Sequence, residues 1–240
     1  MKTKNIMLPV ILLMTFLVLA GIVSAANIIT ISNYETKITV DKDKISFEKR
    51  VTLQNTGKNT IIPGELHFKL YEITDNDEKT IPKISNLVST DLYNNDLSAR
   101  IVSKKGEAEV VISAWQPILP QFEYDIVLKY SIDFSPKGIL FHNLNFPDEE
   151  TTIPITNTKT TITLPSKYTI SYAPNATVTK GNGVTMAEWK NVREKTIEYT
   201  MLPFVKTDIH GATIFWISLI VLLSIPLVII LVGEIMHKRE

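Results

Sequence analysis

The sequence predicts an all-β protein that carries one transmembrane helix near its C-terminus. From Ile28 to about Val205, apolar and polar side chains alternate with period two, in short segments separated by turn residues. A run without any ionisable side chain follows, from Gly211 to Gly233. Half-polar strands are typical of antiparallel sheets with one solvated face, so we expect one or two antiparallel Ig-like β-sandwiches ahead of the helix.

The N-terminal segment has the three parts of a secretory signal peptide. Met1-Lys2-Thr3-Lys4 is basic, an apolar run extends from Ile6 to Val23, and Ser24-Ala25-Ala26 supplies small residues. We therefore expect residues 1–26 to be a signal peptide. In the alternative they remain as an N-terminal membrane helix, because the run is long enough to span. The lysines favour a cytoplasmic N-terminus in both cases, so the residues that follow are predicted to be exported.

The clearest strand is Ile45–Leu53, in which odd positions are mostly apolar and even positions are polar, with Lys49 as the exception. Asn55-Thr56-Gly57 follows it, and Asn and Gly tolerate the positive φ of tight turns. Gly181-Asn182-Gly183 is likewise predicted to be a hairpin turn. Further strands are predicted at Leu66–Tyr71, Glu109–Ser113, Phe122–Tyr130, Thr160–Leu164, Thr169–Tyr172, Val184–Trp189 and Lys195–Met201.

A proline-bearing segment divides the β region. Gln116-Pro117-Ile118-Leu119-Pro120 cannot lie in a central strand, because proline has no N–H to donate. We therefore expect two sandwich domains, at residues 27–115 and 116–207, each of a length that suits an Ig-like module. In the alternative, the whole region forms one larger sandwich in which this segment is an edge or a corner.

The apolar run at residues 211–233 is predicted to be a transmembrane helix. About 20 residues at 1.5 Å each cross a hydrocarbon core of about 30 Å. Trp216 suits the interfacial belt at one end, and His237-Lys238-Arg239 at the other end favours the cytoplasmic side. Residues 234–240 then form a short cytoplasmic tail. We expect a single-pass protein of the cell membrane with its N-terminal domain outside.

Composition excludes several classes of function. There is no cysteine, which excludes disulfides, zinc–thiolate sites, iron–sulfur clusters and cysteine nucleophiles. The 25 basic side chains balance the 25 acidic ones, so no net field attracts nucleic acid. The sequence contains neither a Gly-x-Ser-x-Gly elbow nor a glycine-rich phosphate loop. We expect no enzyme activity, no cofactor, no nucleic-acid partner and no small-molecule substrate.

Histidines and acidic residues give no metal site. His67 is expected on the polar face of its strand, and His142 in a loop beside Phe141. Asp75-Asn76-Asp77-Glu78 fails the calcium-loop pattern, and we expect it and Asp148-Glu149-Glu150 to be solvated turns. The remaining histidines are His210, at the predicted membrane edge, and His237, on its other side.

One modification motif is present. Asn175-Ala176-Thr177 is an N-glycosylation sequon in a segment predicted to be exported. Asn175 is therefore a candidate for glycosylation in a host that glycosylates.

Five segments follow one another in an order that is similar to that of a known family. They are Val51-Thr52-Leu53-Gln54-Asn55-Thr56-Gly57, Val110-Val111-Ile112, the aromatic-rich strand Tyr124–Tyr130, Thr160-Thr161-Ile162-Thr163-Leu164-Pro165-Ser166 and Ile170-Ser171-Tyr172. Their arrangement resembles the luminal part of ribophorin I, a non-catalytic subunit of the oligosaccharyltransferase. The resemblance implies a scaffold subunit near the translocation or glycosylation machinery, with no catalytic residue.

Without an active-site motif, binding is the function that the sequence favours. Edge strands and end loops of β-sandwiches suit contacts with proteins or glycans. We expect a non-catalytic, membrane-anchored extracytoplasmic protein that is an accessory or scaffold subunit of a membrane complex and has protein partners in the membrane or cell envelope. The alternative is a stand-alone cell-surface protein for adhesion, envelope structure or ligand binding.

Overall fold

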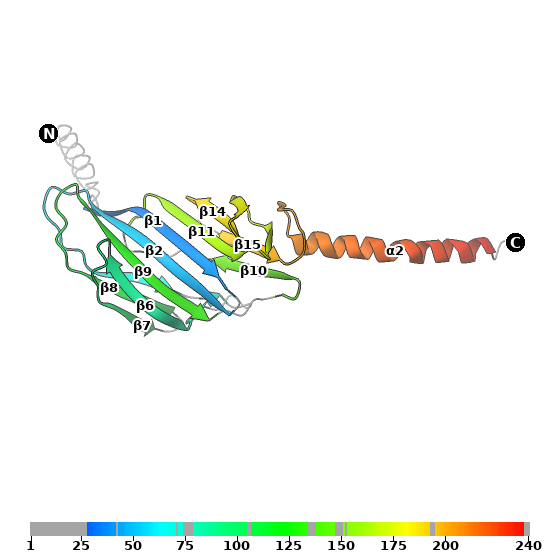
Figure 1. Ribbon diagram of the computed structural model, residues 1–240, viewed down its shortest axis with the longest axis horizontal. Coiled ribbons are helices and arrows are strands. Elements are labelled where there is room, and N and C mark those ends of the chain that lie inside the picture. Colours follow the sequence, from blue (N-terminus) through cyan, green and yellow to red (C-terminus); the bar gives the residue numbers. More distant parts are fainter. Residues whose placement is uncertain are drawn as a thin grey trace, which may run out of the picture.

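The computed structural model (Figure 1) confirms the predicted fold class, a β-sheet domain followed by one long helix. It describes residues 28–41, 43–70, 72–73, 79–104, 107–133, 138–146, 151, 153–192 and 195–237. The strands are β1 (Ile29–Val40), β2 (Lys44–Asn55), β3 (Gly64–Leu70), β4 (Glu72–Ile73), β5 (Lys79–Thr80), β6 (Ile84–Asp91), β7 (Ala99–Lys104), β8 (Glu107–Ala114), β9 (Glu123–Asp133), β10 (Phe141–Phe146), β11 (Thr158–Pro165), β12 (Thr169–Tyr172), β13 (Thr177–Gly181), β14 (Val184–Lys190) and β15 (Lys195–Thr200). The helix is α2 (Gly211–His237).

The strands that the alternation predicts are confirmed as β2, β3, β8, β9, β11, β12, β14 and β15. The Gly181-Asn182-Gly183 turn joins β13 to β14, and Asn182 and Gly183 both have positive φ, at 51° and 77°. This backbone is the type I′ geometry whose twist matches that of the flanking strands. The proline-bearing segment lies outside the named strands, where Ile118 forms an isolated bridge with Ile61 and packs in the core at 2% exposure.

A seven-stranded sheet forms the body of the domain, in the order β13-β14-β11-β1-β2-β9-β6. Among the described residues there are also two three-stranded sheets, β3-β8-β7 and β10-β15-β12, and the short pair β4-β5. The strand ladders are antiparallel with one exception, since β1 and β11 pair in parallel. Strands on both sides of residue 116 belong to the large sheet, and the division into domains at 27–115 and 116–207 stays a prediction.

Both three-stranded sheets cover the same face of the large sheet. On β1 the inward residues that follow the bulge at Ile31–Asn33 are even-numbered: Tyr34 belongs to a first core cluster, and Ile38 and Val40 to a second. The first cluster is covered by β3 and β8 and includes Leu66 and Phe68. The second lies under β15 and β12, around Ile162, Leu164, Ile170, Trp189 and Ile197.

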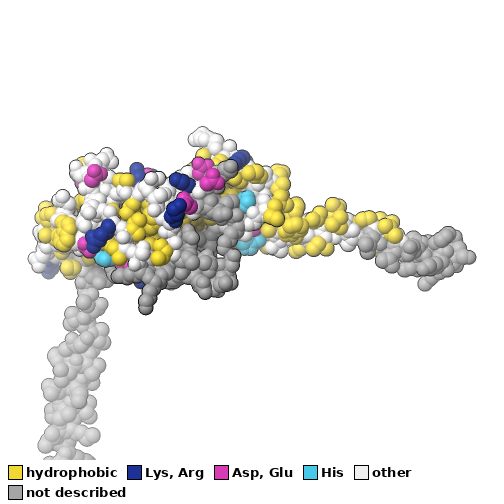
Figure 2. Space-filling view, turned by 90° about the horizontal axis from the view of Figure 1, so that it is seen from below, with side chains coloured by type: hydrophobic (Ala, Val, Ile, Leu, Met, Phe, Trp, Pro, Cys, Tyr) yellow, Lys and Arg dark blue, Asp and Glu magenta, His cyan; other side chains and the backbone are white. Residues whose placement is uncertain are grey.

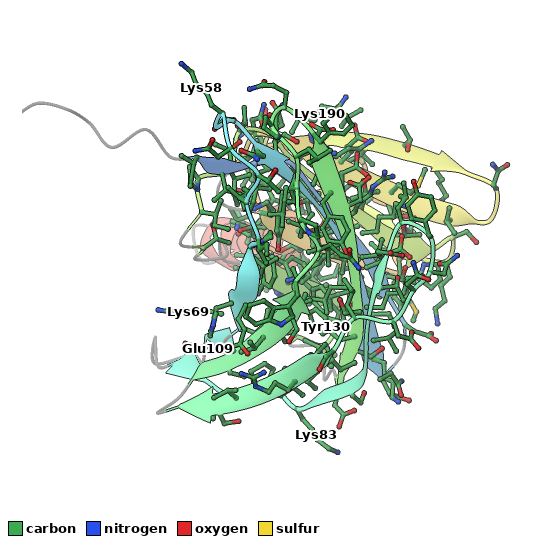
Figure 3. All side chains as sticks on the ribbon, turned by 90° about the vertical axis from the view of Figure 1, so that its left-hand side faces the viewer. Lys58, Lys69, Lys83, Glu109, Tyr130 and Lys190 are labelled. Atoms are coloured by element: carbon green, nitrogen blue, oxygen red, sulfur yellow. The ribbon has the colours of Figure 1, made fainter. Side chains whose placement is uncertain are left out.

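Lys49 lies on the inward face of β2 between these two clusters. It is 1% exposed, and its Nζ is 5.0 Å from the centroid of the Tyr130 ring and 5.7 Å from that of Phe47. Figure 3 shows Tyr130 inside the domain. Thr36 and Thr160, the neighbours of Lys49 across β1 and β11, are also buried. A polar row therefore separates the two apolar clusters, which explains why Lys49 interrupts the alternation.

Burial and the nearby Lys195 lower the pKa of Lys49 well below its ordinary value. An unfolded lysine keeps a pKa of about 10.4, so between these two values the unfolded chain binds more protons than the folded one. We expect the free energy of unfolding to rise with pH through this window, by up to about 1.4 kcal/mol per pH unit.

Urea unfolding at a series of alkaline pH values measures this slope. Lys49→Met is expected to remove the contribution of this lysine and to be more stable than the wild type at neutral pH. The matched control is Lys37→Met, because Lys37 is an exposed partner of Glu48. Equal slopes in the wild type and in Lys49→Met would contradict the effect of burial.

α2 extends away from the β domain, so that most of its length touches no other element (Figure 1). Most of its described apolar side chains are exposed, among them Ile220, Leu222 and Ile229. A helix that is apolar on all sides and unburied in its own domain is long and apolar enough to cross a membrane.

Candidate functional site

An apolar cavity lies at the end of the domain that is farthest from α2, which we call the far end. Its volume is about 290 Å³. Three strands supply most of the apolar wall, because each directs alternate side chains inward at this end. The wall includes Ile29 and Ile31 of β1, Leu53 of β2, Leu66 and Phe68 of β3, and Ile61.

The cavity follows the outer edge of β3. Outward residues of this strand, Glu65 and His67, line it together with the inward residues Leu66 and Phe68. In the part of the chain that the structure describes, β3 pairs with β8 on one side only. Thr151 and Ile153 also line the cavity. The cavity is thus an opening between the two layers of the sandwich.

Charged groups lie at the mouth of the cavity, on the outward face of β3. Arg100 Nη2 donates to both carboxylate oxygens of Glu65 at 3.0 Å, and His67 Nδ1 lies 3.3 Å from Glu109 Oε2. Figure 3 shows Glu109 beside Lys69, its partner across the β3–β8 ladder. The mouth therefore offers polar contacts, whereas the wall is apolar.

Asn55, in the predicted Asn-Thr-Gly turn, organises the loops around the cavity. Its side chain is fully buried, and its amide nitrogen donates to the carbonyls of Asn59 and Ile118 at 2.8 Å. Its amide oxygen accepts from the N–H of Gly57 at 2.9 Å. One side chain thus ties the loop after β2 to the proline-bearing segment. Replacing it would leave the buried carbonyl of Ile118 without this donor.

These loops present a rim of exposed apolar side chains beside the cavity. Trp115 packs against Gly64, which precedes the wall residues of β3. Two more rim residues, Ile28 and Phe122, are held through their backbone carbonyls, which accept from the N–H groups of Thr56 (3.0 Å) and Asn55 (3.1 Å). The rim consists of Ile28, Ile62, Trp115, Leu119 and Phe122, each more than half exposed.

A second concentration of polar contacts lies where α2 leaves the domain. The Glu198 side chain is buried there, and its carboxylate accepts from Ser171 Oγ at 2.6 Å and from the backbone N–H of Ala212 at 3.2 Å. His210 Nδ1 lies 3.2 Å from its other oxygen. A carboxylate at this position satisfies a free N–H of the first helical turn and complements the helix dipole.

Close packing completes this junction. A Cβ on Gly211 would lie 2.5 Å from Ser171 Cβ, so only glycine fits at the first position of the helix. Phe141 of β10 contacts Phe204 and Phe215, with ring centroids 5.5 and 5.8 Å away. The start of α2 is therefore held against the domain by both polar and aromatic contacts.

Ser, His and Glu also form hydrolase triads, but the order of contacts differs at this junction. In a triad the histidine bonds to the serine and takes its proton. Here Ser171 is fully buried and donates to Glu198, and His210 bonds to the same carboxylate. His210 contacts the carboxylate and not Ser171 Oγ, so the three residues lack the histidine–serine contact of a triad, and their contacts hold the start of α2 against the domain.

The other candidate residues that the sequence suggested do not come together in one site among the described residues. His67 is exposed on the polar face of its strand, as predicted. The prediction that His142 lies in a loop is wrong, because it belongs to β10 and packs 5.3 Å from the Tyr199 ring. Among the described residues, no group of three or more His, Asp and Glu could hold a metal ion. The acidic clusters at 75–78 and 148–150 lie outside the described residues.

Asn175 lies in the exposed turn between β12 and β13, with φ at 58°. Thr177, the third residue of the sequon, is also exposed. A glycan on Asn175 would therefore project into solvent. Its glycosylation stays a prediction.

The sequence matches no protein-family model and no curated protein. In fold it is similar to a candidate nutrient-binding protein of Legionella pneumophila, with a TM-score of 0.50 and 8% identity over 72% of this chain and 67% of that one. A lower TM-score, 0.44 at 12% identity, relates it to an M1 zinc metallopeptidase of Deinococcus radiodurans, over 72% of this chain and 42% of the peptidase. The first likeness concerns the fold alone, and the second supports no conclusion.

Proposed function

We propose that this chain is a membrane-anchored, non-catalytic binding protein. In this proposal α2 spans the membrane, the β domain lies on its outer side, and the far-end cavity binds a small ligand. The observation that supports it best is the combination of an open apolar cavity at one end of the domain with an unburied apolar helix at the other.

The dimensions and sequence of α2 support the anchor. Its 27 residues measure about 40 Å at 1.5 Å per residue, which exceeds a hydrocarbon core of about 30 Å. No ionisable side chain occurs from Gly211 to Gly233, and Lys238 and Arg239 follow the helix. Basic residues at that end favour a cytoplasmic C-terminus, which supports an outer location for the β domain.

The cavity indicates the chemistry of the ligand. Ligand pockets usually measure about 300–1,000 Å³, so a cavity of about 290 Å³ suits a small molecule. Its wall is formed by Ile, Leu and Phe side chains, and its mouth by Glu65 and His67. We therefore propose a ligand with an apolar body that enters the sandwich and one polar end that stays at the mouth.

A second candidate function is an accessory subunit of a membrane complex, which the resemblance to ribophorin I implies. The exposed apolar rim at the far end supports it, because such patches often mark protein contacts. Residues 51–57, which contribute to the resemblance, also hold this rim in place through Asn55.

Native mass spectrometry of the tagged full-length protein, released gently from its own membranes, tests the cavity. We expect a small molecule bound to the wild type. Ile61→Trp is expected to lose it, since an indole at this wall position occupies the cavity. The matched control is Ile101→Trp: Ile101 is a 42% exposed isoleucine of β7 that does not line the cavity, and this variant should keep the ligand.

The same sample distinguishes the two candidate functions. Another membrane protein recovered in near-equal amount would favour the accessory subunit. A wild-type protein that carries neither a small molecule nor a partner would contradict both proposals.

A further inference from the structure

Five apolar side chains surround the point where α2 leaves the β domain, and we call them the collar. Their exposure is large, at 95% for Ile139 and 80% for Val205, and Figure 2 shows hydrophobic side chains gathered at this point. The collar consists of Ile139, Leu140, Met201, Val205 and Ile209. It comes from the loop before β10 and from the segment between β15 and α2.

Hydrogen bonds hold the collar in place. Thr200 Oγ1 donates to the carbonyl of Leu140 at 2.7 Å and accepts from the N–H of Leu202 at 3.1 Å, which joins the two loops. The N–H of Thr207 donates to the carbonyl of Ser171 at 2.9 Å, which ties the second loop to β12. These contacts hold the apolar side chains in a defined position beside the helix.

Gly138 sets the conformation that presents Ile139. Its φ is 97°, a left-handed value that favours glycine, and a Cβ there would overlap with the backbone oxygen of Phe141. The neighbouring Ile139 is almost completely exposed. A turn that requires glycine thus places a large apolar side chain in contact with the surroundings, which an aqueous surface does not explain.

The junction at Glu198 relates the collar to the membrane. Because Glu198 and Phe141 hold the first turn of α2 against the domain, the collar lies at the level where the helix begins. Trp216, half exposed on the second turn, is a residue type that gathers at membrane interfaces. A helix that enters the bilayer at Gly211 therefore brings the collar to the interface with it.

We propose that the collar is immersed in the lipid interface, so that the β domain rests directly on the membrane. The inference rests on the proposed function, since it requires α2 to span. The partner is the lipid itself: the five collar residues are 40–95% exposed, and on the face seen in Figure 2 hydrophobic side chains continue from this point onto α2.

Single-cysteine variants test this inference, because the chain has no cysteine of its own. Ile139→Cys and Val205→Cys, each labelled with an environment-sensitive fluorophore, are placed in full-length protein in phosphatidylcholine vesicles. Lipids with a nitroxide near the headgroup are then added. The matched control is Ile101→Cys, because Ile101 is a 42% exposed isoleucine of β7 that lies outside both the collar and the cavity lining. At both collar positions we expect the emission to be blue-shifted and the nitroxide lipids to quench most of its intensity. At the control position we expect neither the shift nor the quenching.

Flotation of the vesicles separates the ways in which this can fail. Protein that floats with the vesicles but has unquenched collar labels would overturn the collar inference and leave the anchor intact. Labels that are blue-shifted but unquenched would mean that protein covers the collar, which also overturns it. Protein that does not float would contradict the anchor itself, and the collar inference with it.

Discussion

Glu198→Ala is expected to lower the free energy of unfolding of the β domain by about 2–4 kcal/mol. The Glu198 side chain is fully buried, and its carboxylate accepts hydrogen bonds from Ser171 Oγ and from the N–H of Ala212. The substitution removes this acceptor. Loss of a helix cap costs about 0.5–2 kcal/mol, and buried donors left without a partner cost about 1–3 kcal/mol. Urea unfolding of the purified protein in detergent, followed by circular dichroism, measures the change.

Two further variants show whether the loss of stability comes from the hydrogen bonds of Glu198. Glu198→Gln keeps an acceptor oxygen of the same reach, so we expect a loss smaller than that of the alanine variant. Glu188→Ala removes a carboxylate that pairs with Lys159 and Lys190 on the surface of β14, and such pairs contribute about 0–1 kcal/mol. If Glu198→Ala cost no more than Glu188→Ala, the junction would not hold the helix as described.

Trp189→Ala is expected to cost about 3–5 kcal/mol, the usual range for removing a buried tryptophan. Trp189 is 1% exposed at the centre of the second core cluster, and its Nε1 donates to the carbonyl of Pro174 at 2.8 Å. The alanine variant loses the packing and leaves that carbonyl without its donor. Urea unfolding followed by circular dichroism is the suitable measurement, because tryptophan fluorescence changes with the substitution itself.

Trp189→Phe and Trp115→Ala are the comparison variants. Trp189→Phe keeps most of the apolar contact and loses the hydrogen bond, so its cost should lie well below that of alanine. Trp115 is 64% exposed at the rim, and its removal should change stability by no more than about 0.5 kcal/mol. Equal costs for Trp189→Ala and Trp115→Ala would contradict the second core cluster.

Strand positions were predictable where one face of a strand is buried along its whole length. Ile45–Leu53 and Val184–Trp189 alternate regularly, and both are strands. The alternation does not single out β1, because a bulge between Ile31 and Asn33 shifts it by one residue. It does not predict β10 either, since the buried residues Phe141 and Leu144 are three apart.

The sites could not be predicted in the same way, because they depend on contacts between distant segments. The cavity joins residues of β1, β2 and β3 with Thr151 and Ile153, which follow β3 by about eighty residues. Glu198 lies between Ile197 and Tyr199, a pattern that predicts a solvated side chain. It is buried because α2 begins directly over it. Of the residues that organise the cavity, only Asn55 belongs to a motif visible in the sequence, the Asn-Thr-Gly turn.

Membrane topology tests the central claim most directly. A membrane-impermeant maleimide is applied to intact cells that express full-length Thr179→Cys, an exposed position on β13, or Lys238→Cys, which follows α2 in sequence. If α2 anchors the domain outside, Thr179→Cys is labelled in intact cells, and Lys238→Cys only after the membrane is permeabilised. Labelling of both positions before permeabilisation, or of neither, would contradict the account of a membrane-anchored outer binding domain.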